Sequence, residues 1–468
     1  MTNVSGANLN NGAAVGPQGE GRESPSSFPK YPAYKDSGVE WLGEVPQHWP
    51  VYSLKRTVDG CVNGLWGDEP DGENDIAVIR VADFERSFSM IGLDKLTYRS
   101  ITPKERQSRL IKSGDLLIEK SGGGEKTLVG CVVLFTHEFD AVTSNFVARM
   151  RPLAEFDSQF LCYAFGNLYH GRVNYPSVKQ VTGIQNLDAE SYLQERFSVP
   201  SRVEQTQIVR FLDHETARID ALIEEQQRLI ELLKEKRQAV IARAVTKGLD
   251  PTVPMKDPGV EWLGEVPAHW VVLAIKWRAR IKSGDGISPD LIESQAQEDK
   301  PHPVIGGNGV MGFTSQANVS PPLIVIGRVG ALCGNVHKIL DPAWVSDNAL
   351  ILDFDRRSFD INYLVHVLDA RNLNEISDKS AQPLITGSKV TSQYIPCPSR
   401  HEQLAIAKFL EGALSEVDQL VLEGIKGIEL LKERRSALIS AAVTGKIDVR
   451  GWQPPACAPI PELVEEAV

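Results

Sequence analysis

The residues of this chain most able to do chemistry lie in short glycine-rich or charged motifs. The run Gly307-Asn-Gly-Val-Met-Gly312 matches the G-x-G-x-x-G pattern of dinucleotide-binding turns. Such a turn must open a helix, whereas this chain continues as FTSQANVSPP, with two prolines soon after the motif. The sequence therefore predicts a glycine-rich loop whose backbone can approach another molecule closely, rather than a dinucleotide site.

Two further motifs match phosphate and metal sites only in part. The run Gly122-Gly-Gly-Glu-Lys-Thr127 lacks the spacing of a phosphate-binding loop, and an apolar, strand-like stretch follows it instead of a helix. Asp115, Glu119 and Lys120 are the residue types of a nuclease site, yet Glu119 and Lys120 are adjacent and would point to opposite faces of a strand. No histidine and cysteine cluster has zinc-ligand spacing. We predict no catalytic residue and no metal site on this chain.

Basic and amide side chains in and around glycine-rich loops form a candidate DNA-binding set. Such groups position phosphates and hydrogen-bond base edges. For any single residue a solvated surface position is the more ordinary interpretation, so the prediction concerns the set. Its members are Lys120, Ser121, Lys126, Asn145, Lys179, Gln180, Asn308, Arg328, Asn348, Gln382 and Lys389.

Two long helices must position these loops. The first begins at the capping-box residues Ser201 and Glu204, contains no Pro or Gly up to Lys247, and ends before Gly248. A second stretch from Pro398 repeats the same capping box, apolar stripe and glycine stop. Because each apolar stripe needs a long partner, we expect the two helices to pair. The predicted pairing residues are Ile219, Leu222, Ile223, Leu233, Val240, Val417, Leu420, Val421, Leu431 and Leu438.

A second internal repeat precedes each helix. KDSGVEWLGEVPQHW at Lys35–Trp49 returns as KDPGVEWLGEVPAHW at Lys256–Trp270, and strand-like runs follow both copies. The chain is therefore predicted to be α+β, a pseudo-two-fold repeat of two mixed modules with two long helices that pair as an antiparallel coiled coil. The predicted division is a disordered tail (1–30), module one (31–200), a helix (201–250), module two (251–397), a helix (398–448) and a loose tail (449–468).

Composition is typical of a globular protein. The six cysteines are scattered, which favours free thiols in a reducing cytoplasm. Neither a signal-peptide pattern nor an apolar run of membrane-spanning length is found, so we expect no membrane partner and a cytoplasmic location. The net charge of −11 argues weakly against nucleic-acid binding but does not exclude it, because local patches and partner subunits can supply positive charge.

In combination, these motifs resemble the specificity subunit of type I restriction–modification systems. The resemblance rests on the paired Pro200–Gln205 and Pro398–Gln403 helix starts, the repeated G-V-E-W-L-G-E-V-P-x-H-W segment and the stretches PVIGGNGVMGF and IVIGRVGALCGNV. An A-V-T run followed by glycine at the end of both helices adds to it. The resemblance covers the chain from about Tyr31 to Asp448.

The resemblance implies that each module is a target-recognition domain reading one half of a bipartite, asymmetric site on double-stranded DNA. It implies that the helices act as a spacer and dock two methyltransferase subunits, which motor–nuclease subunits can join. S-adenosylmethionine, ATP and Mg would then be bound by partner subunits, with no cofactor on this chain. The stripe from Ile219 to Ala244 is on the order of 40 Å long, close to one turn of B-DNA.

Two other interpretations stay open from the residues alone. A structural coiled-coil adaptor without DNA readout would explain the helices but not two modules with divergent interiors. An orphan nuclease or nucleotide-binding enzyme would rest on the incomplete motifs. No recognisable pattern encodes the target sequence, the base-contacting residues or the spacer length. The same holds for the role of the N-terminal tail and for the choice between restriction and methylation alone.

Overall fold

The computed structural model describes residues 28–122, 127–181, 184–378 and 383–455. Within them the chain forms two compact units, the first from the described residues up to 223 together with those from 429 onwards, and the second from those between 224 and 428. Each unit therefore holds one module together with part of both long helices. The predicted six-part division of the chain stays a prediction, since a compact unit is not the same thing as a recognition domain.

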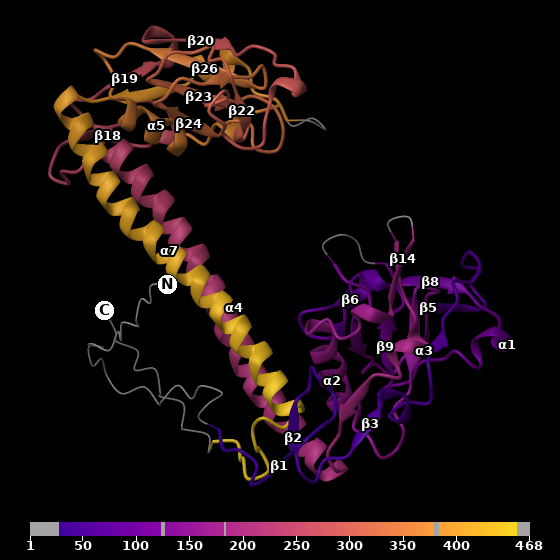
Figure 1. Ribbon diagram of the computed structural model, residues 1–468. Helices are drawn as coiled ribbons and strands as arrows, with labels where there is room; N and C mark the ends of the chain where they lie inside the picture. Colours follow the sequence, from indigo (N-terminus) through magenta and orange to yellow (C-terminus); the bar gives the residue numbers. More distant parts are fainter. Residues whose placement is uncertain (1–27, 123–126, 182–183, 379–382, 456–468) are drawn as a thin grey trace, which may run out of the picture. The chain divides into compact units, whose positions relative to one another are not determined.

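The two long helices are α4 (Arg202–Lys247) and α7 (Arg400–Val443), which run side by side in Figure 1. Arg435 Nε of α7 donates to Asp220 Oδ1 of α4 at 2.9 Å, and Arg237 Nε donates to Asp418 Oδ1 at 3.1 Å. The partner's number falls as the α4 number rises, so the pairing is antiparallel. The predicted α+β class and the paired helices are confirmed.

Buried and half-buried positions on both helices recur at alternating steps of four and three, the heptad spacing of a coiled-coil seam. On α4 they are Ile219, Ile223, Gln226, Ile230, Leu233, Arg237, Val240 and Ala244. On α7 they are Val417, Val421, Gly424, Ile428, Leu431, Arg435, Leu438 and Ala442.

Two predicted pairing residues lie outside this seam. Leu222 is 41% exposed and Leu420 is 50% exposed. Leu222 follows the seam residue Ile219 by three positions, and Leu420 follows Val417 by three. At these points the next seam residue is four positions on, at Ile223 and Val421. Their assignment to the seam is wrong for that reason, whereas the other predicted pairing residues belong to the series.

One glutamate at the start of each long helix fastens the repeated Trp-containing segment to it. In the first unit Trp49 Nε1 donates to Glu204 Oε1 at 3.1 Å, and His48 Nε2 lies 3.0 Å from Glu204 Oε2. In the second unit Trp270 Nε1 donates to Glu402 Oε1 at 3.0 Å. Both indoles are buried. In each unit the P-x-H-W motif supplies the tryptophan and the P-x-x-x-E-Q motif supplies the glutamate of this hydrogen bond. The two motifs therefore recur together.

The predicted capping box forms completely only in the second copy. Ser399 N and Oγ both donate to Glu402 Oε2, and Glu402 N donates to Ser399 Oγ at 3.3 Å. In the first copy Ser201 Oγ accepts from Glu204 N, but the Glu204 carboxylate accepts instead from the Tyr31 hydroxyl at 2.7 Å. The first carboxylate is thus used for tertiary contacts instead of closing the box.

Glu402 should make the stability of the second unit depend on acid pH. Its partial burial would raise its pKa, but hydrogen bonds from His269, Trp270 and Ser399 outweigh burial and lower the pKa to about 2. Because the folded-state pKa is depressed, this stabilisation is present above the ordinary glutamate pKa and is lost as pH falls from about 4.5 towards about 2. Urea unfolding followed from about pH 6 downwards should show a loss that Glu402→Gln removes. The exposed Glu416→Gln variant should keep it, and an unchanged acid profile in Glu402→Gln would contradict this assignment.

The glycine that ends each long helix lies against the tryptophan of one copy of the repeated segment. Gly248 has φ +74°, and a Cβ placed there would lie 3.1 Å from the Trp270 ring. Gly445 has φ +73°, and a Cβ there would clash with Pro46 beside Trp49. Glycine is therefore required at both positions by backbone conformation and by space.

Module one is built around a four-stranded antiparallel sheet in the order β11-β9-β13-β4. Leu116 and Ile118 of β9 pack in the same core as the helix α2, and Leu117 faces a second apolar cluster. Two three-stranded sheets, β12-β5-β8 and β10-β15-β14, complete the module. The bounds are β4 Val62–Asn63, β5 Asp75–Ile79, β8 Thr97–Ser100, α1 Pro103–Arg106, β9 Leu116–Glu119, β10 Ser121–Gly122, β11 Val132–Leu134, β12 Ala141–Thr143, β13 Val147–Met150, α2 Ser158–His170, β14 Val178–Val181, β15 Ile184–Leu187 and α3 Ala189–Tyr192.

Module two repeats this plan with the sheet β20-β26-β23-β24 and a smaller sheet β22-β21-β25. Ile324 and Ile326 of β23 pack in the core that contains α5, while Val325 faces the smaller sheet. The bounds are β20 Ala279–Ser283, β21 His302–Gly306, β22 Gly309–Thr314, β23 Leu323–Gly327, β24 Val336–Ile339, β25 Trp344–Val345, β26 Ala349–Phe354, α5 Ile361–Ala370 and α6 Gly387–Thr391.

Short strands tie the repeated segments into their units. They are β1 Tyr34–Asp36, β2 Glu44–Pro46, β3 Val51–Ser53 and β16 Arg196–Ser198 in the first unit, with β6 Phe84–Glu85 and β7 Met90–Ile91 in module one. In the second unit they are β17 Met255–Lys256, β18 Val266–Pro267, β19 Val271–Ala274 and β27 Tyr394–Cys397. The pairings β16-β3 and β19-β27 each join the segment after the tryptophan to the strand before a long helix.

Parts of both predicted tails are packed. The Phe28 ring lies 5.1 Å from Phe211 of α4, and the Trp452 ring lies 5.3 Å from the same phenylalanine. Asp448 N donates to the Pro29 carbonyl at 2.7 Å, and Val449 is buried. Phe28 and Trp452, which the predicted division places in the two tails, therefore pack against the start of α4. Residues 1–27 and 456–468 lie outside the described ranges.

No helix in the described ranges is both long enough and apolar enough to cross a membrane.

Candidate nucleic-acid interface

In module one the candidate residues gather where the central strand β9 ends. Lys120 N donates to the Phe146 carbonyl at 2.8 Å, which joins this end to the loop before β13. Lys120 Nζ donates to Asn63 Oδ1 at 2.8 Å, and Ser121 Oγ donates to Asn186 Oδ1 at 2.5 Å. The end of β4, the loop before β13 and strand β15 are thereby joined to the segment Lys120–Ser121.

Other candidates of module one lie on neighbouring loops and strands. Asn145 is exposed and directly precedes Phe146, whose ring is 51% exposed. Lys179 and Gln180 lie on β14, in the same small sheet as Ser121. The ammonium of Lys179 is paired with Asp188 at 2.8 Å, so it is less available to a ligand than the sequence predicts.

In module two the candidates gather at the end of β23 and around a hollow of about 450 Å³. Arg328 N donates to the Asn348 carbonyl at 2.9 Å, and Arg328 Nη1 donates to Ser283 Oγ at 3.2 Å. The hollow is lined by Gly306, Gly307, Asn308, Gly309, Val310, Met311, Val329, Gly330 and Asn348. Asn308 and Asn348, far apart in sequence, therefore share one concave surface.

The side chains of Asn308 and Asn348 are exposed, and neither amide makes a hydrogen bond to a described residue. The His337 ring lies beside the hollow, 3.6 Å from where a Cβ on Gly309 would stand, and burial lowers its pKa. The hollow thus presents amide donors and acceptors, which suits a planar partner with its own donors and acceptors.

The glycine-rich stretch that matches G-x-G-x-x-G forms a β-hairpin. Gly307 and Asn308 connect β21 to β22, and Gly309 has φ +102°. A dinucleotide site needs a helix at this point, whereas here strand β22 begins at Gly309.

The sites of the two modules occupy equivalent places. The sheet orders β4-β13-β9-β11 and β20-β26-β23-β24 correspond strand by strand. The bond from Lys120 N to Phe146 O matches that from Arg328 N to Asn348 O, and the side chains of Lys120 and Arg328 bond to Asn63 and Ser283, the last residues of β4 and β20. One structural position therefore carries different side chains in the two modules.

One of the remaining predicted residues is engaged in an ion pair, and two are not described. Lys389 on α6 is paired with Asp378 at 2.6 Å. Lys126 and Gln382 lie outside the described residues. Conversely, Asn63, Phe146 and Ser283 belong to the sites but were not predicted, and aligning Ser144-Asn-Phe with Ser346-Asp-Asn before the equivalent strands could have found Phe146.

The suspected nuclease residues are engaged in structural ion pairs. Asp115 Oδ2 accepts from Arg151 Nη2 at 2.7 Å, and the buried Glu119 is paired with Arg86 at 2.9 Å. Within the described ranges no group of three or more His, Cys, Asp or Glu side chains could hold a metal ion. These carboxylates therefore stabilise module one instead of presenting ligands to a metal.

Comparison with known proteins found related specificity subunits. Over 132 residues the chain is 31% identical to the type I restriction enzyme EcoprrI specificity subunit of Escherichia coli, a match covering 28% of this chain and 33% of that protein. Over 441 residues it is 22% identical to a protein described as the type I restriction enzyme MjaX specificity subunit of Methanocaldococcus jannaschii, covering 87% of this chain and 96% of the relative. This chain is a relative of type I restriction specificity subunits. The resemblance seen in the sequence motifs is confirmed.

The fold of this specificity-subunit relative also has a counterpart among solved structures. A chain from a structural study of complex assembly and conformational transition of the type I restriction–modification system superimposes with a TM-score of 0.66 at 14% identity. The match covers 85% of this chain and 98% of that chain. No family model matches the sequence. The likeness to this chain is therefore one of fold.

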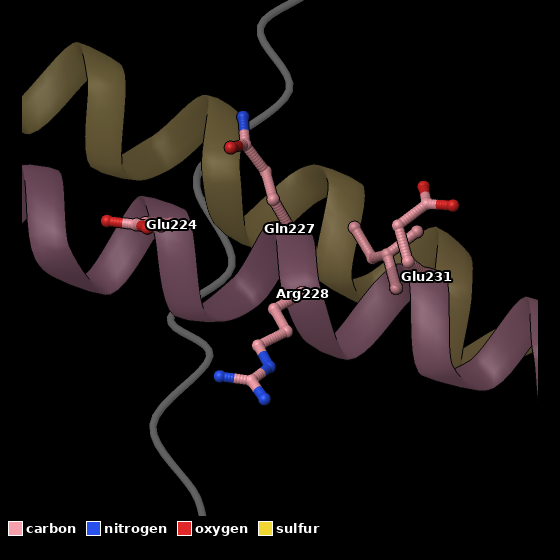
Figure 2. A pocket seen from close by; sticks show the side chains of 5 residues that line it. Glu224, Gln227, Arg228 and Glu231 are labelled. Carbon is pink, nitrogen blue, oxygen red and sulfur yellow. The ribbon is translucent and has the colours of Figure 1, made fainter.

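The coiled coil has a surface feature of its own in the second unit. A hollow of about 490 Å³ is lined by Glu224, Gln227, Arg228, Ile230 and Glu231 of α4 (Figure 2). A Cβ on the seam residue Gly424 would lie 3.1 Å from Ile230 Cγ1, so the glycine lets α7 approach α4 closely here. Several large apolar side chains of the coil in this unit are exposed, namely Leu229, Leu232, Leu404, Phe409, Leu420, Leu422 and Ile425.

Proposed function

We propose that this chain is the DNA sequence-specificity subunit of a type I restriction–modification complex. Each module reads one half of a bipartite, asymmetric site, and the paired helices set the spacing between the halves. The observation that carries the proposal is the pair of equivalent loop sites with different side chains, Lys120 with Phe146 in one module and Arg328 with Asn348 in the other. Such a scaffold can read two different sequences with one geometry.

Chemistry in this proposal belongs to partner subunits. Two methyltransferase subunits supply S-adenosylmethionine-dependent methylation, and motor–nuclease subunits supply ATP- and Mg-dependent steps. The exposed apolar side chains of the coil, together with its hollow, support docking of proteins there, since exposed apolar patches commonly mark such interfaces. The chain alone is then a non-catalytic component, and its place of action is the cytoplasm.

Exchange of one module tests the proposal. Replacing residues 51–200 with the matching part of a related subunit should change one half of the methylated site and leave the other half and the spacing unchanged. The measurement is methylation-site mapping with the reconstituted methyltransferase. A structural adaptor predicts no change in either half, and a change in both halves would equally contradict the division of labour.

Asparagine residues in the module-two hollow should determine part of its half-site. An asparagine amide can pair bidentately with adenine, and each such pair is worth about 1–3 kcal/mol of discrimination. Asn308→Ala together with Asn348→Ala should therefore relax the module-two half-site by about tenfold or more and leave the module-one half-site intact. Competition binding with single-base variants measures this, and Asn318→Ala, at an asparagine bonded within the module to Asp285 and Val345, is a control. Unchanged discrimination at both halves would rule out these amides as readers.

A further inference from the structure

An exposed row of basic side chains runs along the edge strand β20 of module two. Arg278 directly precedes the strand, and Arg280 and Lys282 lie within it. Alternate residues of a strand share one face, so the side chains of Arg280 and Lys282 lie on the same side of the sheet, with Cα atoms about 7 Å apart. Arg278 ends the short 3-10 turn that leads into the strand. All three are exposed, as is Lys276, whose ammonium lies 5.5 Å from the centre of the 69% exposed Trp277 ring. We call Lys276, Arg278, Arg280 and Lys282 the β20 stripe.

The stripe is not neutralised by ion pairs. None of its four side chains makes a salt bridge or a side-chain hydrogen bond to a residue in the described ranges. Asp353 faces Arg280 across the strand pair, and Asp355 lies close enough to Arg278 to interact with it electrostatically. Because Arg356 and Arg357 follow directly, the local balance stays positive in a chain whose net charge is −11.

The stripe leads directly to the candidate reading site. Ser283 follows Lys282, and its hydroxyl accepts the hydrogen bond from Arg328 beside Asn348. Gly284 comes next, where a Cβ would clash with the Val345 and Ser346 carbonyls, so the strand end is held tightly against the site. A ligand that meets the asparagine-lined hollow therefore has the stripe at its flank.

The fold does not require these charges. In module one, Asn63 occupies the position of Ser283. The residues equivalent to Arg278, Arg280 and Lys282 are therefore Val58, Gly60 and Val62, and none of these is charged.

The arginines on the neighbouring strand of module one are paired instead. Arg149 is paired with Asp59 and Arg151 with Asp115. At the described residues of the equivalent strand in module one, no such row of exposed, unpaired basic side chains is found.

We propose that the β20 stripe is a phosphate-contact surface by which module two holds the backbone of duplex DNA beside the half-site it reads. The proposal rests on the proposed function. From Arg278 to Lys282 the stripe extends at most about 13 Å, which corresponds to up to about four base pairs of duplex axis. Contacts of this kind fix register and supply salt-dependent affinity without reading bases.

The test is Arg278→Gln with Arg280→Gln and Lys282→Gln in the full chain, reconstituted with its methyltransferase partner. Binding of duplex DNA is measured as Kd against salt concentration. Losing three phosphate contacts should reduce the slope of log K against log salt by up to about 2.7, which makes the fall in affinity between 50 and 200 mM salt roughly 40-fold smaller. The methylated sequence should not change.

Two controls make the result specific. Lys30→Gln with Lys35→Gln and Lys95→Gln removes the same charge from the first unit, where none of these lysines is in an ion pair, and should leave the slope unchanged. Arg278→Lys with Arg280→Lys keeps the charge and should behave as the unmodified chain. The stripe proposal is overturned if the salt slope is unchanged in the Arg278→Gln, Arg280→Gln, Lys282→Gln variant. It is also overturned if the slope falls equally in the Lys30→Gln, Lys35→Gln, Lys95→Gln control. Either result leaves the proposed function standing. A reconstituted complex without any sequence-dependent DNA binding overturns both.

Discussion

Ile230→Asp should destabilise the second unit by about 3–5 kcal/mol. Ile230 is 7% exposed and lies in the helix seam against Gly424, so the new carboxylate would be buried without a partner. The neighbouring variant Leu229→Asp provides a matched comparison, because Leu229 is 46% exposed and lies outside the seam. Its free energy of unfolding should change by less than about 1 kcal/mol.

Urea unfolding of the two purified full-length variants measures the difference. Equal stability of Ile230→Asp and Leu229→Asp would show that the heptad seam is not the main contact between the helices. If Leu229→Asp folds normally but fails to bind the methyltransferase partner, the exposed face of the coil is assigned to docking.

Lengthening both helices should lengthen the gap between the half-sites. Four residues inserted after Glu231 and four after Glu429 add about 6 Å to each helix. A four-residue insertion is a stutter, which a coiled coil accommodates by local unwinding, so the seam can continue through it. At about 3.4 Å per base pair, the preferred gap should grow by one or two pairs.

Methylation-site mapping of the double insertion measures the gap. The insertion after Glu231 alone is the control, because it moves the two seams out of register and should abolish assembly. An active complex with the original gap would show that the helices do not set the spacing.

The repeats explain why the overall plan could be predicted from sequence. Two copies of the tryptophan-containing segment and of the P-x-x-x-E-Q start predict two similar units, and the structure gives the cause, since Trp49 meets Glu204 and Trp270 meets Glu402. The seam was predicted less well. A helix counted at 3.6 residues per turn admits Leu222 and Leu420, but a coiled coil repeats every 3.5 residues and leaves both outside.

The candidate site was predictable by residue type but not by pairing state. Loop position and side-chain chemistry led to Lys120, Arg328 and Asn348, and the structure holds Arg328 and Asn348 together by a backbone hydrogen bond. No sequence pattern shows that Lys179 and Lys389 are paired with Asp188 and Asp378, because those contacts depend on strand register and loop closure. The β20 stripe was overlooked because its alternating charges occur in a strand and not in a glycine-rich loop.

The two units differ in how they can be completed during synthesis. The second unit is one continuous stretch of chain, whereas the first needs residues on both sides of it. Phe211 of the first unit is covered in part by Trp452, and Ile208 shares a core with Ile447 and Val449. Those partners emerge from the ribosome more than 200 residues later, which corresponds to at least about 10 s at usual elongation rates. During that interval the start of α4 has an uncovered apolar surface. The first unit, although its synthesis begins first, is therefore the last to complete its core.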